Sequence, residues 1–294
     1  MNKVGFIGVG IMGKSMVRNL MKAGFELHIY ARTKSKVEDV IGEGAQFHES
    51  IKDCVQDCDA VITIVGFPQD VEEVYFDQGK ILDSAKKGAY LIDMTTTSPQ
   101  IAEKIYEEGT KRGFHVMDAP VTGGDTGAKA GTLSILVGGE KEDYEACMPL
   151  FEAMGTNINY QGKAGCGQHC KLANQIMIAG TLSGVCEALT YAKEQGLDPE
   201  VFMKSVATGA AGSKQLDTFG PKILKDDYAP GFFMKHFIKD MKLALIEANR
   251  KGLSLDVLSM VLANYEELEQ EGYGDLGTQA LMKFYDEEHR NTEE

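Results

Sequence analysis

A glycine-rich turn near the start of the chain limits what the first half can fold into. Residues 4–8 have the apolar character of a short buried strand, and Gly8, Gly10 and Gly13 follow with the spacing Gly-x-Gly-x-x-Gly. The next residues predict a helix over about 11–23 and a second strand over 27–30. Strand, turn, helix and strand within about 30 residues form a βαβ unit.

The three glycines have separate mechanical roles in such a unit. Gly8 permits the tight turn, Gly10 lets a pyrophosphate approach the backbone, and Gly13 lets the helix pack closely on the strand. The backbone amides at the start of the helix, at Ile11 and Met12, can then bind phosphate. We therefore predict a dinucleotide-binding site and not merely a glycine-rich turn.

The end of the second predicted strand bears on which dinucleotide is bound. NAD binders place an Asp or Glu there, which accepts a hydrogen bond from the ribose 2′-hydroxyl. Here residues 30–36 read Tyr-Ala-Arg-Thr-Lys-Ser-Lys, and no carboxylate occurs before Glu38. Arg32, Thr33 and Lys36 suit a 2′-phosphate, so we expect NADP(H), with NAD(H) as the alternative. Arg32 and its neighbours can also be solvated residues at a helix start.

Strand and helix patterns continue to about residue 160 and predict an open α/β sheet. Strands are expected at 60–65, 89–93, 114–118, 131–138 and 157–160, and helices at about 99–112 and 141–154. Ligands of doubly wound sheets lie outside the carboxyl ends of the strands. Val65-Gly66, Thr96 and Thr122-Gly123-Gly124 fall at such ends. Each alone is better explained as a turn, but together they outline the rim of a site.

The composition changes after residue 162. Gly162, Gly165 and Gly167 mark a linker, and a long helix-forming stretch then runs to Gln195. Helical segments are expected near 199–208, 214–225, 232–251, 256–270 and 277–288, before a polar tail at 287–294. We predict an α/β Rossmann-type doubly wound domain at 1–162. It is followed by an all-α domain at 163–294 for substrate binding and oligomerisation, which begins with the long helix that joins the two domains.

The long helix carries Lys171, Asn174 and Gln175 at positions i, i+3 and i+4, so they share one face. A lysine beside two amides at a domain junction can face a cleft, where burial lowers its pKa toward the working pH. Spacing alone fits a surface lysine at least as well. Lys239 and Asp240, adjacent on a later helix, can likewise be a surface ion pair that contributes little.

The net charge and the cysteine content limit the kinds of partner and ligand that we expect for this chain. The net charge of −14 argues against a nucleic acid or an anionic membrane surface as partner. No apolar run approaches the roughly 18 residues that span a bilayer. The chain enters a strand at once, so we expect no cleaved signal peptide and a cytoplasmic location. Cys166, His169 and Cys170 crowd one turn, but reduced core or loop cysteines explain them better than a metal site.

Four motifs, in order along nearly the whole chain, resemble the β-hydroxyacid dehydrogenases. This family includes 3-hydroxyisobutyrate dehydrogenase, tartronate semialdehyde reductase and glyoxylate/succinic semialdehyde reductase. The motifs are Gly8-x-Gly-x-Met-Gly13 with Asn19-Leu20, Asp118-Ala-Pro-Val-Thr-Gly-Gly124 with Gly131-Thr-Leu133, Gly165-x-Gly-x3-Lys171-x2-Asn174, and Lys239-Asp240-x2-Leu243-Ala244. The resemblance implies hydride transfer between NADP(H) and a small β-hydroxy acid or its semialdehyde, without a metal.

The resemblance also implies roles for single residues. Lys171 is expected to be the general acid/base. The residues expected to contact the substrate are Thr122, Gly123, Gly124, Asn174, Gln175, Phe232 and Asp240. The residues expected to contact the cofactor are Thr96 and Lys239, in addition to Gly8, Gly10, Ile11, Met12, Gly13, Arg32, Thr33, Lys36, Val65 and Gly66. Thr122 replaces a frequent Ser and Gln175 a second Asn, which reshapes the substrate pocket without removing its chemistry.

Three other interpretations are open. 6-Phosphogluconate dehydrogenase shares the architecture, but its family pairs the lysine with a nearby His that is missing after Lys171. Imine reductases resemble the architecture but usually lack the lysine. A non-catalytic dinucleotide-binding or scaffold protein is the third, and Lys171, Asn174 and the Thr-Gly-Gly loop together argue against it. A homodimer or homotetramer is expected at the level of the family.

Overall fold

The computed structural model describes residues 1–285, and these divide into two compact units. The first holds Met1–Lys171 and the second begins at Leu172. The domain boundary predicted after residue 162 falls at the end of the last strand, a short loop before the long helix. The tail predicted at 287–294 lies outside the described residues.

The first unit is built on a sheet that has nine strands in the described chain, in the order β3-β2-β1-β4-β5-β6-β8-β7 with β9 beside β8. The strands are β1 Lys3–Ile7, β2 Glu26–Tyr30, β3 Gln46–Phe47, β4 Ala60–Thr63, β5 Tyr90–Asp93, β6 His115–Asp118, β7 Val121–Thr122, β8 Leu133–Gly139 and β9 Gly155–Gly162. Strands β1 to β6 pair in parallel, whereas β8 is antiparallel to β6 and β7. The order 3-2-1-4-5-6 is that of a doubly wound Rossmann sheet.

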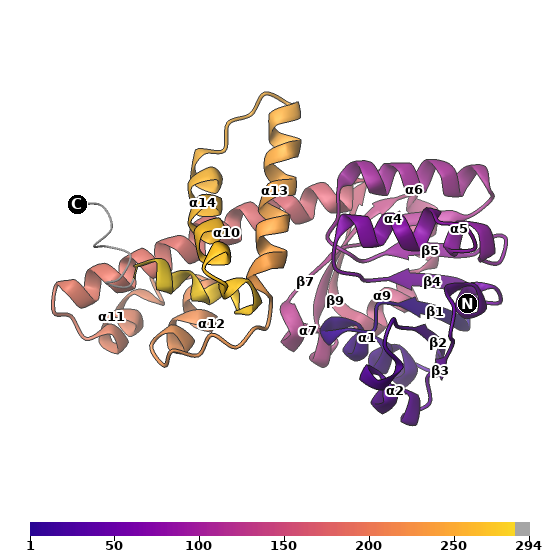
Figure 1. Ribbon diagram of the computed structural model, residues 1–294, viewed down its shortest axis with the longest axis horizontal. Coiled ribbons are helices and arrows are strands. Elements are labelled where there is room, and N and C mark those ends of the chain that lie inside the picture. Colours follow the sequence, from indigo (N-terminus) through magenta and orange to yellow (C-terminus); the bar gives the residue numbers. More distant parts are fainter. Residues whose placement is uncertain (286–294) are drawn as a thin grey trace. The chain divides into compact units, whose positions relative to one another are not determined.

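Helices cover both faces of this sheet, with α4 and α6 on one side and α1 on the other (Figure 1). They are α1 Ile11–Lys22, α2 Glu38–Gly42, α3 Ile51–Val55, α4 Pro68–Phe76, α5 Ile81–Ser84, α6 Pro99–Lys111, α7 Gly124–Ala130, α8 Lys141–Ala146 and α9 Met148–Met154, with a 3-10 turn, η1, at Lys34–Lys36. One core packs beneath α1, α2 and α9, the other beneath α3 to α6. Because both faces are covered, β1, β4 and β5 are buried along nearly their whole length, whereas β9 is largely exposed.

Two predicted elements differ in detail. The helix expected at 141–154 is two helices, α8 and α9, and Pro149 lies in the first turn of the second. A proline lacks the amide that a continuing helix needs, so it fits a helix start. Thr122 lies in the two-residue strand β7, paired with Ser134, rather than in an irregular turn.

The second unit is helical, and its described part contains no strand beyond one isolated bridge between Phe233 and Gly277. Its elements are α10 Cys166–Glu194, which begins in the first unit, α11 Pro199–Val206, α12 Lys214–Ile223, α13 Met234–Arg250, α14 Asp256–Gln270, η2 Tyr273–Asp275 and η3 Thr278–Tyr285. The helix predicted at 277–288 is therefore 3-10 over its described part. The predicted fold class, α/β followed by all-α, is confirmed.

By length and composition alone, α10 is apolar enough to cross a bilayer, although the sequence showed no continuous apolar run of that length. Leu172, Leu182 and Leu189 on this helix instead lie in the core of the second unit, together with Phe237. That packing accounts for part of the apolar character of α10, because 44% of its most apolar window is buried.

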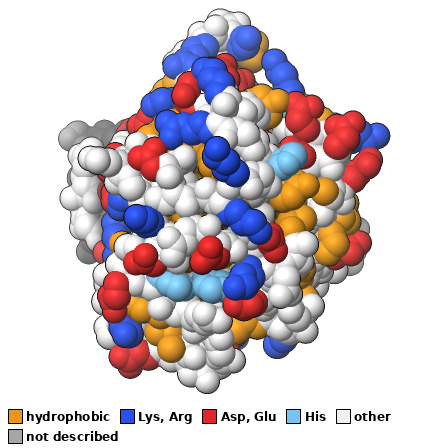
Figure 2. All heavy atoms as spheres, turned by 90° about the vertical axis from the view of Figure 1, so that its right-hand side faces the viewer, with side chains coloured by type: hydrophobic (Ala, Val, Ile, Leu, Met, Phe, Trp, Pro, Cys, Tyr) orange, Lys and Arg blue, Asp and Glu red, His pale blue; other side chains and the backbone are white. Residues whose placement is uncertain are grey.

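Basic and acidic side chains are intermixed on the face of the molecule in Figure 2, and neither sign gathers into a large area there. Many cations of the first unit are paired, for example Arg18 with Asp39 at 2.8 Å and with Glu43 at 2.7 Å. Exposed pairs of this kind contribute little stability.

Candidate active site

The glycine turn after β1 has the close contacts that its sequence spacing requires. Gly8 has a φ of +99°, and a Cβ there would lie 2.0 Å from the carbonyl oxygen of Ile64. A Cβ at Gly13 would lie 2.1 Å from the carbonyl oxygen of Gly8. By contrast, a Cβ at Gly10 would meet no atom of the described chain within 4 Å. The turn is thus tightly packed at its ends and open at its middle.

The open middle of the turn coincides with the start of α1. Gly10 is the N-cap and supplies no side-chain acceptor, so the first amides of the helix, at Ile11 and Met12, have no acceptor within the helix. A helix N-terminus with open space in front of it fits a pyrophosphate. The residues present therefore suit a dinucleotide.

Basic side chains follow β2, where the adenosine ribose is bound in doubly wound folds. The Arg32 side chain is 79% exposed, and its guanidinium lies 3.4 Å from Asp70 Oδ1. Lys34 lies 3.6 Å from Glu49 Oε1, and Lys36 is exposed. Exposed pairs at these distances hold a side chain only loosely. A role of Arg32, Thr33 or Lys36 in cofactor choice stays a prediction.

Hydrogen bonds join the carboxyl ends of β4 and β5. Asp93 Oδ1 accepts from Thr63 Oγ1 at 2.7 Å and from the Thr95 amide at 3.1 Å, and burial raises the pKa of Asp93 to about 6. Thr95 Oγ1 in turn accepts from the Val65 amide at 3.0 Å. The predicted cofactor residues Val65, Gly66 and Thr96 thus lie in two loops that are bonded to each other.

The start of α10 is capped by a residue from the end of β6. Asp118 accepts from the amide of Gly165 at 2.7 Å and from that of Gln168 at 2.8 Å. Burial raises the pKa of Asp118, and the two amide donors act in the opposite direction. A Cβ at Gly167 would lie 2.3 Å from the carbonyl oxygen of Leu136, so the first turn lies directly against the sheet. Lys171, only 7% exposed, follows one turn later.

The predicted carboxylate-binding loop forms the connection between β7 and α7. Gly123 and Gly124 have φ values of +130° and +65°, which side chains other than glycine's rarely allow. Gly123 precedes α7 as its N-cap without a side-chain acceptor. The loop therefore has the Thr122 hydroxyl and two residues without side chains at the end of strand β7 in the first unit.

The polar residues predicted in the second unit form one chain of contacts. Asn174 Nδ2 donates to Gln175 Oε1 at 2.8 Å, and Gln175 Nε2 donates to Asp240 Oδ2 at 2.7 Å. Lys239 Nζ lies 2.8 Å from Asp240 Oδ1. Phe232 lies apart from this chain and stacks near His236, with 6.4 Å between ring centroids. The adjacent Lys239 and Asp240 are not a surface pair, because the Asp240 side chain is only 1% exposed.

No role was predicted for Asp93, Thr95, Thr97 or Gln168, although their hydrogen bonds connect the strand ends to α10. One signal was present for Gln168, which precedes Lys171 by three residues and so shares its helix face. Nothing in the sequence near Asp93 or Thr95 indicated that they would be bonded to residues of other strands.

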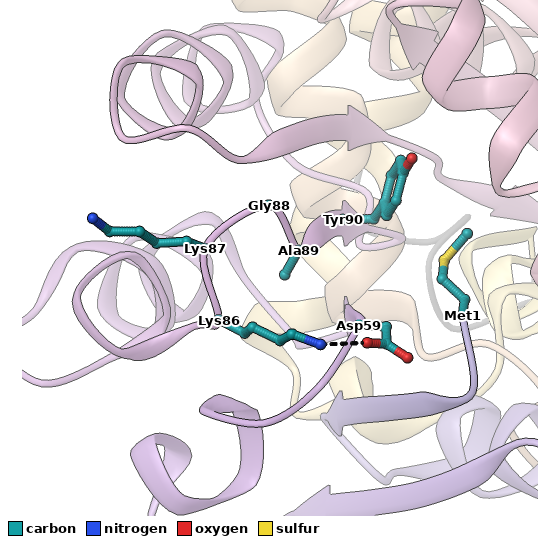
Figure 3. Close-up of a pocket in the computed structure, with 7 residues that line it drawn as sticks. All are labelled: Met1, Asp59, Lys86, Lys87, Gly88, Ala89 and Tyr90. Atoms are coloured by element: carbon teal, nitrogen blue, oxygen red, sulfur yellow. Dashed lines mark hydrogen bonds and ion pairs between the residues drawn. The ribbon is translucent and has the colours of Figure 1, made fainter.

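A cavity of about 250 Å³ lies elsewhere, at the amino ends of the parallel strands (Figure 3). Its lining includes Met1, which precedes β1, Asp59, which precedes β4, and Tyr90, which begins β5. Lys86 points toward Asp59, and its Nζ lies 2.7 Å from Asp59 Oδ1. Dinucleotides bind at the opposite, carboxyl ends of such strands, so this cavity is not the predicted site.

The six cysteines are all free thiols, four of them buried and Cys166 and Cys170 half-buried. Within the described residues, no group of three or more His, Cys, Asp or Glu side chains is arranged to hold a metal ion. Burial raises the pKa of Cys170, so its thiol is not activated.

Comparison with known proteins gives matches along almost the entire chain. Residues 3–162 match the NAD binding domain of 6-phosphogluconate dehydrogenase, and residues 165–285 match the NAD-binding domain of NADP-dependent 3-hydroxyisobutyrate dehydrogenase. The uncharacterized oxidoreductase YkwC of Bacillus subtilis is 49% identical over 96% of this chain and 98% of its own. A probable 3-hydroxyisobutyrate dehydrogenase-like protein 1, mitochondrial, of Arabidopsis thaliana is 44% identical over 95% of this chain and 84% of its own.

A solved structure agrees with these matches. The 3-hydroxyisobutyrate dehydrogenase of Mycobacterium tuberculosis with L-serine has a TM-score of 0.88 at 26% identity, over 96% of this chain and 98% of that one. Fold, glycine turn and matches together define an NAD(P)-dependent oxidoreductase of the hydroxyacid dehydrogenase type. The chain belongs to the β-hydroxyacid dehydrogenase family.

Proposed function

We propose that this protein transfers a hydride reversibly between NADP(H) and a small β-hydroxy acid or its semialdehyde, with Lys171 as general acid/base. The observation that carries the proposal is the placement of Lys171. It is buried on the first turns of a helix whose start is capped by Asp118 at the carboxyl end of β6. A lysine amine held at such a position can donate a proton to a substrate oxygen and take it back.

The chain's own residues have the following roles in this proposal. The amides at the start of α1 hold the pyrophosphate, and Arg32 with Thr33 and Lys36 holds a 2′-phosphate. The bound dinucleotide would supply or accept the hydride. Lys171 donates a proton to the substrate oxygen during reduction and takes it back during oxidation.

The substrate class follows from the loop after β7 and from the relatives. The Thr122 hydroxyl and the amides of Gly123 and Gly124 would bind the substrate carboxylate, and Asn174 would orient the substrate oxygen beside Lys171 on the same helix. One family match is named for an NADP-dependent 3-hydroxyisobutyrate dehydrogenase, and the solved relative is described with L-serine, a β-hydroxy acid. Both support a short acid with a β-hydroxyl group.

The test is a turnover assay with NADPH and NADH side by side. In the panel, glyoxylate, succinic semialdehyde and tartronate semialdehyde are reduced with these cofactors. The hydroxy acids 3-hydroxyisobutyrate, L-serine and 6-phosphogluconate are oxidised with NADP+ and NAD+ instead. We expect Lys171→Ala to lower kcat by roughly 10²- to 10⁴-fold, the usual contribution of a general acid/base, while NADPH binding by fluorescence persists. Lys193→Ala, at an exposed lysine in the last turn of the same helix, is the matched control and keeps wild-type turnover.

Three results would contradict the proposal. Near-wild-type turnover of Lys171→Ala excludes the mechanism. NADPH binding without turnover of any panel compound favours the scaffold alternative. Preferred oxidation of 6-phosphogluconate favours the alternative enzyme.

A further inference from the structure

The side-chain amide of Gln168 joins two segments that are far apart in the sequence. It is fully buried, its Nε2 donates to the Thr95 carbonyl oxygen at 2.7 Å, and its Oε1 accepts from the Thr97 amide at 2.9 Å. These two partners flank Thr96, the residue predicted to lie at the nicotinamide ribose. The amide therefore fixes the backbone of the loop after β5 on both sides of Thr96.

The backbone of Gln168 is fixed independently of its side chain. Its amide donates to Asp118 Oδ2 at 2.8 Å, and Gly167, next to it, lies against the carbonyl oxygen of Leu136. Gln168 thus connects three elements, namely β6, the loop after β5 and the first turn of α10. All of these contacts lie within the first unit.

The position of Gln168 relative to Lys171 gives this connection a functional meaning. The two residues are three apart on α10, so they lie on neighbouring turns of one face. A neutral amide contributes no proton and, being buried, has no contact with solvent. Its two hydrogen bonds are specific in direction, which a packing residue of the same volume would not need.

We propose that Gln168 is a positioning residue: it sets the distance between the Lys171 ammonium and the loop that carries Thr96. The inference rests on the proposed function, because it assigns Lys171 the proton transfer. A displacement of about 1 Å between reacting groups can lower a rate by about 100-fold, so the loss of this link is expected to act on the chemical step. It leaves the groups that bind the dinucleotide phosphates unchanged.

Substitutions of Gln168 test this positioning role in the full-length protein. Gln168→Met keeps the length of the side chain and removes both hydrogen bonds. We expect it to lower kcat roughly 10- to 100-fold, with NADPH affinity within about threefold of wild type. The primary deuterium isotope effect on kcat, measured with NADPH deuterated at the transferred position, should rise because hydride transfer becomes slower. Gln168→Glu, which is neutral when buried and then has one donor and one acceptor, should recover most of the turnover.

A core substitution separates positioning from mere stability. Leu150→Ala opens a cavity in the core of the same unit without touching this link, so it should lower the Tm yet keep kcat and the isotope effect. If Gln168→Met does not fold, Gln168→Asn is measured instead, since its shorter amide cannot reach both partners. Its kcat should then be at least tenfold below wild type.

The outcomes distinguish this inference from the proposed function. If wild type turns over and Lys171→Ala does not, but Gln168→Met or Gln168→Asn keeps kcat and the isotope effect, only the positioning role of Gln168 is overturned. If Lys171→Ala keeps turnover, the proposed function fails and this inference fails with it.

Discussion

The side-chain amide of Gln175 donates to Asp240 Oδ2 at 2.7 Å, and both side chains are only 1% exposed. The same Gln175 side chain accepts from Asn174 Nδ2 at 2.8 Å. Both polar ends of Gln175 are therefore engaged within the protein. Gln175 thus fixes the orientation of the Asn174 amide, and in the proposed function it would act on the substrate through Asn174.

The first prediction concerns this pair. Gln175→Met removes the amide donor to a buried carboxylate and the acceptor for Asn174, so the free energy of unfolding should fall by about 1–3 kcal/mol. The kcat/KM should fall as well, because the Asn174 amide is no longer oriented. Urea titration and steady-state kinetics measure the two effects. Gln195→Met, at an exposed position just after α10, should change neither, and unchanged stability of Gln175→Met would contradict the role of the hydrogen bond.

Substitution by alanine should have different effects at two glycines of the turn after β1. At Gly13 a methyl group meets a backbone oxygen 2.1 Å away, so Gly13→Ala should destabilise the free protein by about 1–3 kcal/mol. At Gly10 it meets open space, and the cost at the N-cap, where alanine is less favourable than glycine, is about 0.5–1 kcal/mol. Gly10→Ala should instead weaken NADPH binding, because the methyl group occupies the approach of the pyrophosphate.

Thermal unfolding and NADPH fluorescence titration separate these two effects. Gly184→Ala, at an exposed and unobstructed glycine of α10, is the control and keeps the NADPH Kd of wild type. Unaltered NADPH affinity of Gly10→Ala would place the pyrophosphate elsewhere.

Arg32 should influence cofactor preference without affecting stability. Its guanidinium is exposed and only 3.4 Å from Asp70 Oδ1, a contact that contributes less than about 1 kcal/mol. If it binds a 2′-phosphate, Arg32→Ala should weaken NADPH binding by about 1.5–3 kcal/mol and leave NADH binding unchanged. Isothermal titration with both cofactors measures the difference. Arg250→Ala, which removes an exposed arginine of the second unit, is the control, and equal losses for NADPH and NADH would refute the assignment.

Asp93 should make the stability of the protein depend on pH. Burial raises its pKa from the usual 3.8 to about 6, so between these values the folded state binds more protons than the unfolded state. Stability therefore falls as the pH rises from about 4 to about 7, by up to about 3 kcal/mol from this one group. Asp93→Asn keeps the acceptor for Thr63 and Thr95 but cannot ionise, so this part of the decrease should disappear.

Urea unfolding of Asp93→Asn at a series of pH values tests the prediction. The difference from wild type should be small near pH 4 and grow toward pH 7 in favour of the variant. Asp57→Asn, at an exposed carboxylate of the same unit, should have the same dependence of unfolding free energy on pH as wild type. If the stability difference between variant and wild type is the same at every pH in this range, Asp93 does not cause the pH dependence of stability.

Much of the first unit was predictable because its strands are buried on both faces. Strands β1, β2, β4, β5 and β6 follow apolar runs that only a parallel sheet explains, and their bounds agree within a few residues. The short elements between residues 34 and 84, among them β3, α2 and α3, were not predicted individually. Segments of two to five residues are too short for a periodic pattern to develop.

The sequence by itself determined the glycine turn, the change from α/β to helical composition and the i, i+3 spacing of Lys171 and Asn174. All of these are local, because neighbours along the chain decide them. Tertiary structure alone decided that Asp118 caps α10, that Gln168 bonds to both sides of Thr96 and that Gln175 bonds to Asp240. Those partners are 47 to 73 residues apart. A buried amide or carboxylate must find a partner wherever the fold places one, and sequence spacing does not encode that choice.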